Sequence, residues 1–258
     1  MMDLKRTTQP RTKLLCILFL LSLLFVGSAK PGNAASLSFS VDGTNAATGT
    51  SLVGWANFVL DSQTNTLTVQ VINGSGNAVQ TTDILGAIFF TNTNGSSILT
   101  PTGASKGPNS YVRNPPATYS IGQQWQFKSG IAGPSGSNSG IGSNSFGGLF
   151  SSGNFAANGQ SVSGINYGIA NGIDQNATAG VKNAVLIQNE VDFSFTVSNG
   201  FSLDSIRDVY FQFGTTTSGP RLFANLSVPE PGSIALLMTM GSSGLLFGFR
   251  QRRLRKRA

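Results

Sequence analysis

The sequence predicts a mainly β protein, an antiparallel β-sandwich of jelly-roll type, flanked by an N-terminal signal peptide and a C-terminal transmembrane helix. Apolar and polar residues alternate in many short segments, as expected of strands with one buried face. Gly, Asn, Ser and Thr abound between these segments, which is typical of turns. The same composition suits exposed strands better than helices, which favour Ala, Leu, Glu and Lys.

The predicted strands follow one another along one domain of residues 36–227. Residues 52–60 and 67–71 are joined by a short polar link, so we expect them to form a hairpin. Many short strands separated by turns favour a sandwich over an α/β fold. Strands are expected at residues 37–41, 52–60, 67–71, 84–90, 119–127, 191–197, 209–213 and 222–226.

The alternation breaks at residues 130–172, where Gly, Ser and Asn dominate. A structureless loop of this length is unusual in a compact domain, so the segment is either a flexible surface excursion or contains short strands and a helical turn. Its scattered aromatic residues, among them Phe146, Phe150 and Phe155, argue against complete disorder. We therefore expect a partly ordered insertion.

The first 35 residues have the layout of a secretory signal peptide. Four basic residues lie within the first 13 positions, and residues 14–26 form an apolar stretch that is too short for a membrane anchor. Small residues follow and end at Ala34 and Ala35, after either of which we expect cleavage. The chain should therefore cross the inner membrane through an export translocase.

Residues 228–258 combine three features in a fixed order. Pro229, Glu230 and Pro231 come first, and an expected transmembrane helix of residues 233–249 follows. Its apolar run would rise about 24 Å, short of the roughly 30 Å hydrocarbon core, so it spans only marginally. A basic stop, expected to stay cytoplasmic, comes last and consists of Arg250, Arg252, Arg253, Arg255, Lys256 and Arg257.

This tripartite tail resembles the PEP-CTERM sorting segment of bacterial proteins that are processed by an exosortase. The resemblance implies an exosortase partner, transient membrane attachment and a final location at the cell surface or outside the cell. Residues 66–73, 82–90 and 206–215 are similar, at modest specificity, to exosortase-dependent surface proteins of unknown function. That second resemblance supports the sandwich and supplies no catalytic residue.

Composition excludes several function classes for the domain. It has no cysteine and no histidine, which rules out disulfides, a Ser-His-Asp triad and a histidine zinc site. Most basic residues belong to the two terminal segments. The domain retains six basic and eight acidic side chains, a net charge of about −2, so we expect no nucleic-acid partner.

Two groups of acidic residues are candidates for chemistry. Glu190 and Asp192 are two apart on one predicted strand, so they share a face, and paired carboxylates can hydrolyse glycosides. They alternate with the apolar core face, so we expect them to be solvated. Residues 42–45 and Asp83 carry oxygen ligands suited to calcium, but ordinary turn roles are favoured. We expect no metal and no cofactor.

The aromatic residues are candidates for stacking on sugar rings. We expect Trp55 to lie in the core, while Trp125 is balanced between core and surface and is a speculative glycan contact. Tyr111 and Tyr119 would share in such a platform.

These features together predict a non-enzymatic, exported protein of the cell envelope, structural or adhesive within the extracellular polysaccharide. A carbohydrate-binding module is the alternative, which an exposed aromatic platform would favour. A secreted hydrolase that relies on carboxylates is the third possibility. It would need a concave site with two converging carboxylates of raised pKa.

Overall fold

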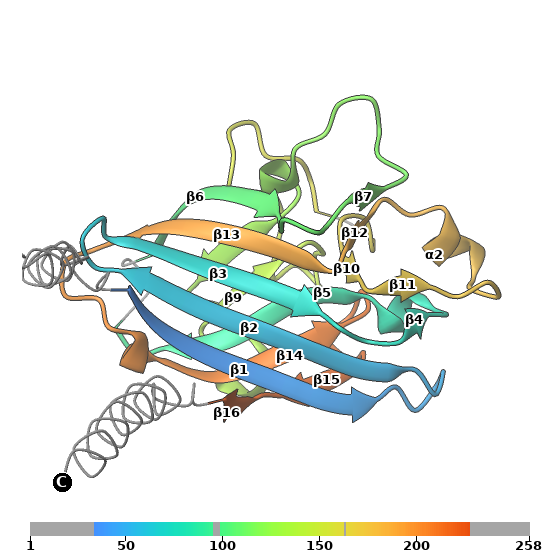
Figure 1. Cartoon of the computed structure of the whole chain (residues 1–258), viewed down its shortest axis with the longest axis horizontal. Coiled ribbons are helices and arrows are strands. Elements are labelled where there is room, and N and C mark those ends of the chain that lie inside the picture. The colour runs from blue at the N-terminus through green and yellow to red at the C-terminus, as the bar shows by residue number, and fades with distance from the viewer. Residues whose placement is uncertain (1–33, 95–98, 163, 228–258) are drawn as a thin grey trace, which may run out of the picture. The chain divides into compact units, whose positions relative to one another are not determined.

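The computed structural model describes residues 34–94, 99–162 and 164–227, which form two β-sheets packed against each other (Figure 1). The sorting motif, the transmembrane segment, the basic stop and the signal peptide up to residue 33 lie outside the described residues. Ala34 and Ala35, the predicted cleavage positions, are the first two residues of strand β1. Within the described residues, no helix is long and apolar enough to cross a membrane.

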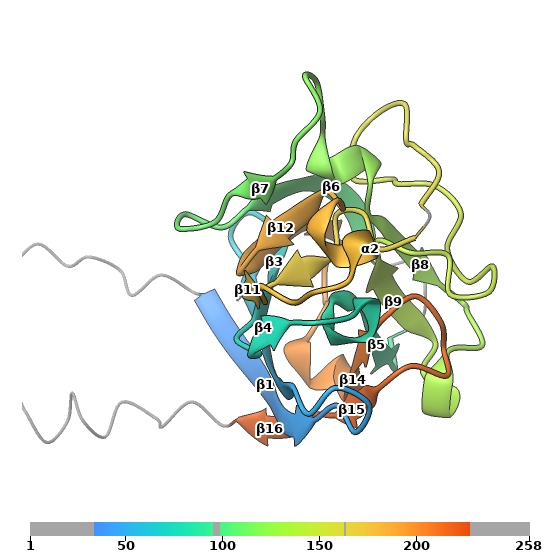
Figure 2. The ribbon, with the colours of Figure 1, turned by 90° about the vertical axis from the view of Figure 1, so that its right-hand side faces the viewer.

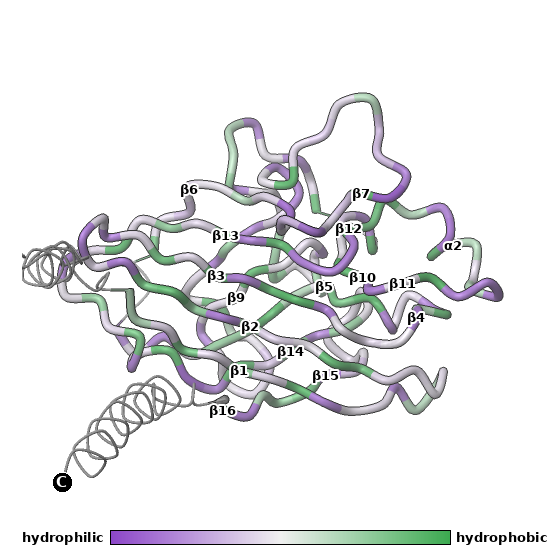
Figure 3. Tube along the Cα trace, viewed as in Figure 1, coloured by the Kyte–Doolittle hydropathy of each residue, from purple (hydrophilic) through white to green (hydrophobic). Residues whose placement is uncertain are grey.

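The first sheet has six strands, all paired antiparallel. Residues of alternating burial face the second sheet and the outside in turn, as the sequence pattern predicts. Along the sheet the strands are β16 (Asn225–Ser227), β1 (Ala34–Thr44), β2 (Ser51–Asp61), β3 (Thr66–Asn73), β13 (Glu190–Val197) and β6 (Leu99–Lys106). Figure 3 shows the resulting alternation of hydrophilic and hydrophobic residues along these strands.

The second sheet is built around β5 (Leu85–Asn92), which pairs with β14 (Ile206–Phe213) on one side and with β9 and β10 on the other. The remaining strands extend from these, and β10 and β12 run parallel. They are β15 (Arg221–Phe223), β8 (Gln126–Ser129), β9 (Ser139–Gly142), β10 (Ile169–Ala170), β12 (Leu186–Gln188) and β7 (Val112–Arg113).

Smaller elements cover one end of the two sheets (Figure 2). Strands β4 (Asn77–Ala78) and β11 (Gly172–Ile173) form a parallel pair there, beside the short helix α2 (Ala179–Lys182). Four 3-10 helices are also present in the described chain, and they span Thr81–Asp83, Ile121–Gln123, Pro134–Gly136 and Leu203–Ser205.

The predicted sandwich is confirmed at the level of two mainly antiparallel sheets. The strand order is not that of the predicted jelly roll, because β1, β2 and β3 are consecutive in the chain and adjacent in one sheet. In a jelly roll, connections would carry consecutive strands to the opposite sheet. Polar links of a few residues join these strands directly, and such short links favour pairing with the nearest neighbour.

Aromatic side chains fill the space between the sheets. Phe58 of β2 meets Phe90 of β5 edge to face, with ring centroids 5.6 Å apart. Phe127 of β8 meets Phe195 of β13 in the same geometry at 5.1 Å. Such pairs add roughly 0.5–1.5 kcal/mol each to the hydrophobic gain of burying the rings.

Strand β5 is buried on both faces, which explains why its sequence is apolar without alternation. Ile88 belongs to the core between the sheets, whereas Phe89 points outward. Phe146 and Phe150 cover that outer side, with ring centroids 6.1 and 5.8 Å from the Phe89 ring. Residues 130–172 thus include a 3-10 turn, strands β9 and β10, and the cover of the second sheet, so they are an integral layer of the domain.

We predict that Phe150→Ala lowers the free energy of unfolding by about 3–5 kcal/mol, because the ring is fully buried and its loss leaves a cavity. Urea denaturation of the processed protein would measure it. Phe223→Ala, the same change at a side chain that is 54% exposed, is the control and should cost about 1 kcal/mol or less. A loss below 1 kcal/mol for Phe150→Ala would show that this layer contributes little to stability.

Candidate functional site

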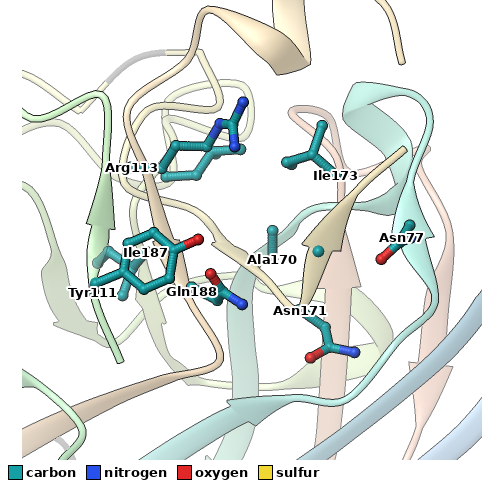
Figure 4. Close-up of a pocket in the computed structure, with 10 residues that line it drawn as sticks. Asn77, Tyr111, Arg113, Ala170, Asn171, Ile173, Ile187 and Gln188 are labelled. Atoms are coloured by element: carbon teal, nitrogen blue, oxygen red, sulfur yellow. The ribbon is translucent and has the colours of Figure 1, made fainter. Parts of the chain in front are cut away.

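A polar pocket of about 290 Å³ opens at the end of the sandwich that carries β4, β7, β11 and β12 (Figure 4). Side chains from separate parts of the chain converge on it. The polar ones are Asn77, Tyr111, Arg113, Asn171 and Gln188. Apolar residues complete the lining, among them Ala170, Ile173 and Ile187.

One wall comes from the pairing of β7 with β12. Arg113 lies opposite Leu186, and the backbone N–H of Gln188 donates to the carbonyl of Tyr111 at 2.8 Å. These bonds bring Tyr111, Arg113 and Gln188 to one side of the pocket although about 75 residues separate the two segments. The positions of these side chains therefore depend on strand register.

The opposite wall comes from β4 and β11, where Asn77 pairs with Gly172. A Cβ atom at residue 172 would overlap Asn77 Oδ1, so glycine is what allows the asparagine side chain to lie against this strand. The Asn171 side chain donates through Nδ2 to the carbonyl of Ser75 at 2.7 Å. This bond fixes one end of the amide and leaves Oδ1 as an acceptor.

A buried asparagine supports the pocket from below. Asn73 is 1% exposed, and its Nδ2 donates to the carbonyl of Ile169 at 2.6 Å. Its Oδ1 accepts from the backbone N–H of Ser75 at 2.9 Å. One side chain thus ties the end of β3 to the start of β10 and holds the two walls at a fixed separation.

The pocket has a positive centre. Among the described residues that line the pocket, Arg113 is the one charged residue. Arg113 Nε is buried and has no hydrogen-bond partner. Tyr111 is 52% exposed and forms the rim. A guanidinium, three amides and a phenol suit a ligand with hydroxyl groups or negative charge.

The structure decides where the two tryptophans lie. The prediction that Trp125 contacts glycans is wrong, because the side chain is fully buried and Nε1 donates to the carbonyl of Tyr167 at 3.0 Å. Its ring packs on Phe193 at 5.0 Å. The predicted core position of Trp55 is also wrong, since it is 39% exposed and its indole lies over Gly74.

Tyr111 and Tyr119 are both exposed, at 52% and 44%, but only Tyr111 lines the pocket. Sequence reasoning missed the remaining polar members of the site. Arg113 is one of six basic residues in the domain and follows Tyr111 by two positions, which is the only local signal that could have drawn attention to it.

Glu190 and Asp192 share the outer face of β13, as expected, but they are partly buried and not simply solvated. Burial raises the pKa of Glu190, and the charge of Asp192 and a hydrogen bond to it raise it further. Gln70 Nε2 donates to Glu190 Oε1 at 3.3 Å. Neither carboxylate lines the polar pocket, so the pair does not converge with the binding groups.

The residues considered for calcium form a hydrogen-bonded turn. Asp42 is exposed and stands apart, while Asp83 is 1% exposed. Asp83 Oδ1 accepts from Asn45 Nδ2 at 2.6 Å and from Thr48 Oγ1 at 2.7 Å. The backbone N–H groups of residues 79 and 80 donate to Oδ2 at 2.9 and 3.0 Å. Among the described residues, no group of three or more His, Cys, Asp or Glu side chains could hold a metal.

Burial by itself would raise the pKa of Asp83. The four donors stabilise the charged form more strongly, so the pKa of this carboxyl lies below its ordinary value. The buried charge is thus held by hydrogen bonds that join the loop after β1 to the loop before β5.

No protein-family model matches this chain, and no curated protein sequence matches it. A solved structure that resembles it is the KRT10-binding region domain of the pneumococcal serine-rich repeat protein PsrP. The two share 11% sequence identity, with a TM-score of 0.27 over 76% of this chain and 88% of the other. Similarity at this level carries no inference about function.

We predict that Asp83→Asn lowers the free energy of unfolding by about 2–4 kcal/mol at pH 7, because an amide nitrogen would face donors that now meet a carboxylate. Since the folded-state pKa is depressed, this stabilisation is present above the unfolded-state pKa of about 3.9 and is lost as the pH falls through the folded value. Urea melts between pH 2 and 7 would measure it.

Asp42→Asn, at an exposed carboxylate three residues before Asn45, is the matched control and should change stability by less than about 0.5 kcal/mol. Addition of a chelator should leave the wild-type melt unchanged. A wild-type melting temperature that falls sharply with chelator would contradict the hydrogen-bond account and favour a metal.

Proposed function

We propose that this chain is an exported, exosortase-sorted protein of the cell envelope, and that its β domain adheres to extracellular polysaccharide. The observation that carries the adhesive role is the polar pocket, in which an exposed tyrosine lies beside a guanidinium and three amides. Aromatic faces and paired amide donors and acceptors are the groups that bind hydroxyl-rich sugars. The export and sorting role rests on the two terminal segments of the sequence.

Strand register supports this assignment through the direction in which the chain leaves the domain. Ser227, the last described residue, pairs with Ser38 near the start of β1. The residues that line the pocket lie on and beside β4, β7, β11 and β12, beyond the point where β3 ends and β13 begins. Figure 1 shows these strands on the right, toward which β1 runs away from Ser38. Asn73, the last residue of β3, lies level with Val41 through Gly54 of β2, and Val41 is three residues, about 10 Å of strand, from Ser38. A domain attached through its C-terminal tail would present the pocket away from the attachment.

We infer binding rather than turnover from the placement of the acidic residues. The hydrolase alternative needs two carboxylates that converge on bound substrate. Glu190 and Asp192 contact each other on the outer face of β13, where Gln70 also binds Glu190. The lining of the pocket contains neither a carboxylate nor a histidine or cysteine within the described chain.

Sorting is tested by changing the motif. Pro229→Ala together with Glu230→Ala should leave the protein in the inner membrane, because the marginal span would persist when the processing signal is lost. Cell fractionation and the mass of the recovered protein would measure this. Pro115→Ala with Pro116→Ala, in an exposed loop of the domain, is the control and should reach the surface. Unchanged delivery of the motif variant to the cell surface would contradict the sorting proposal.

Adhesion is tested with the mature protein recovered from the cell surface. We expect its migration in a native gel to be retarded when extracellular polysaccharide from the same cells is cast into the gel. Tyr111→Ala should reduce the retardation severalfold, because the stacking contact of an aromatic ring is worth roughly 0.5–1.5 kcal/mol. Tyr119→Ala, at an equally exposed tyrosine outside the pocket, is the control. Identical migration with and without polysaccharide would refute adhesion.

A further inference from the structure

We propose that the pocket binds a carboxylate-bearing sugar residue of an acidic polysaccharide, with the Arg113 guanidinium as the partner of the carboxylate. The inference rests on the proposed adhesive function and adds the class of ligand. It follows from the charge of the pocket, the geometry of the guanidinium, and the size and polar lining of the pocket.

The charge of the pocket is positive and uncompensated. Arg113 is its one charged lining residue, while the domain as a whole carries a net charge of about −2. The guanidinium is a cation that offers hydrogen-bond donors and no acceptor. The ligand therefore gains from a negative group placed at Arg113, whereas a second negative group elsewhere would find no partner in the lining.

The guanidinium of Arg113 indicates the kind of negative group. Its Nε is buried without a hydrogen-bond partner, so a ligand in the pocket would meet the two Nη groups. These two groups form a planar fork that matches the two oxygens of a carboxylate. A ligand carboxylate would therefore supply the missing countercharge through two parallel hydrogen bonds.

The remaining lining suits a sugar ring. Gln188 and Asn77 each offer a donor and an acceptor, and Asn171 keeps Oδ1 free while Nδ2 binds the Ser75 carbonyl. The phenol of Tyr111 points into the pocket from the rim, opposite Asn77 and Asn171 (Figure 4). The volume of about 290 Å³ is at the lower end of the roughly 300–1,000 Å³ of small-molecule sites, which fits a single ring.

The same features disfavour a polyanion that binds by charge density. A nucleic acid or polyphosphate is held by several cations at once, and its affinity falls steeply with salt. A single arginine on a net negative domain provides one ion pair, so recognition must be local. We expect a correspondingly weak dependence of affinity on salt.

The test uses the mature protein and two forms of one probe, an oligosaccharide of galacturonic acid and the same oligosaccharide with its carboxyl groups reduced to alcohols. Titration calorimetry should give about 10- to 100-fold weaker binding for the reduced form, the range expected for loss of a charged hydrogen-bonded pair. Arg113→Gln should weaken binding of the acidic form by a similar factor and leave the reduced form nearly unchanged. The two losses should therefore not add.

Arg207→Gln is the matched control, because it removes the same charge from an exposed residue near the start of β14, away from the pocket. It should bind the acidic oligosaccharide as the wild type does. Should Arg113→Gln unfold, as a thermal melt would show, Tyr111→Ala and Arg113→Lys still test the site. The lysine variant keeps the charge but loses the fork, so it should bind at an intermediate strength.

Equal binding of the acidic and reduced oligosaccharides would overturn the proposal while leaving adhesion to neutral sugars intact. Equal weakening by Arg113→Gln and Arg207→Gln would overturn it as well, since net charge alone would then explain the effect. Absence of binding to either oligosaccharide, in a protein that is still retarded by its own extracellular polysaccharide, would reject the carboxylated sugar but not the adhesive function.

Discussion

The packing of aromatic rings between the two sheets is the constraint on which the rest of the structure depends. The domain has no cysteine and no metal cluster among its described residues, so buried apolar area must offset the entropy of ordering the chain. Rings from β2, β5, β8 and β13 meet edge to face in this layer. Because β5 lies at the centre of the second sheet and needs cover on both faces, the glycine-rich segment after β9 folds back and contributes Phe146 and Phe150. A segment that looks like a loop in the sequence is thereby fixed by the hydrophobic effect.

The aromatic layer stops short of one end of the sandwich, where polar interactions take over. Asn73 ties β3 to β10, and Asp83 ties the loop after β1 to the loop before β5. Both side chains are buried and well supplied with partners, as buried polar groups must be. Arg113 Nε is different, because it lies in the same region and has no partner. Four other buried side-chain atoms of the described chain also lack a partner, but among these five Arg113 Nε is the one that belongs to a cation in the pocket lining, which supports the proposed binding site.

The position of the pocket connects the fold to the proposed role. The last described strand pairs with the first, from Asn225 opposite Ser40 to Ser227 opposite Ser38, so it runs away from the end of the sheet that carries the pocket. A protein held through its C-terminal segment would expose the pocket to the surrounding matrix.

The sequence by itself determined many of the strand segments and the faces of β2, β3 and β13, because these depend on periodicity. It did not predict β6, and residues 119–127, expected as a strand, contain a 3-10 helix before β8. The terminal sorting signals stay a prediction. Only the tertiary structure decided which face was covered. Trp55, expected in the core, is exposed, and Trp125, expected equally in the core or at the surface, is buried, since alternation shows which residues share a face but not what packs on it. The pocket was equally out of reach, because Asn77, Arg113, Asn171 and Gln188 meet through the register of short strands that are distant in the chain. Register depends on the complementarity of whole packed layers, and no local pattern records it.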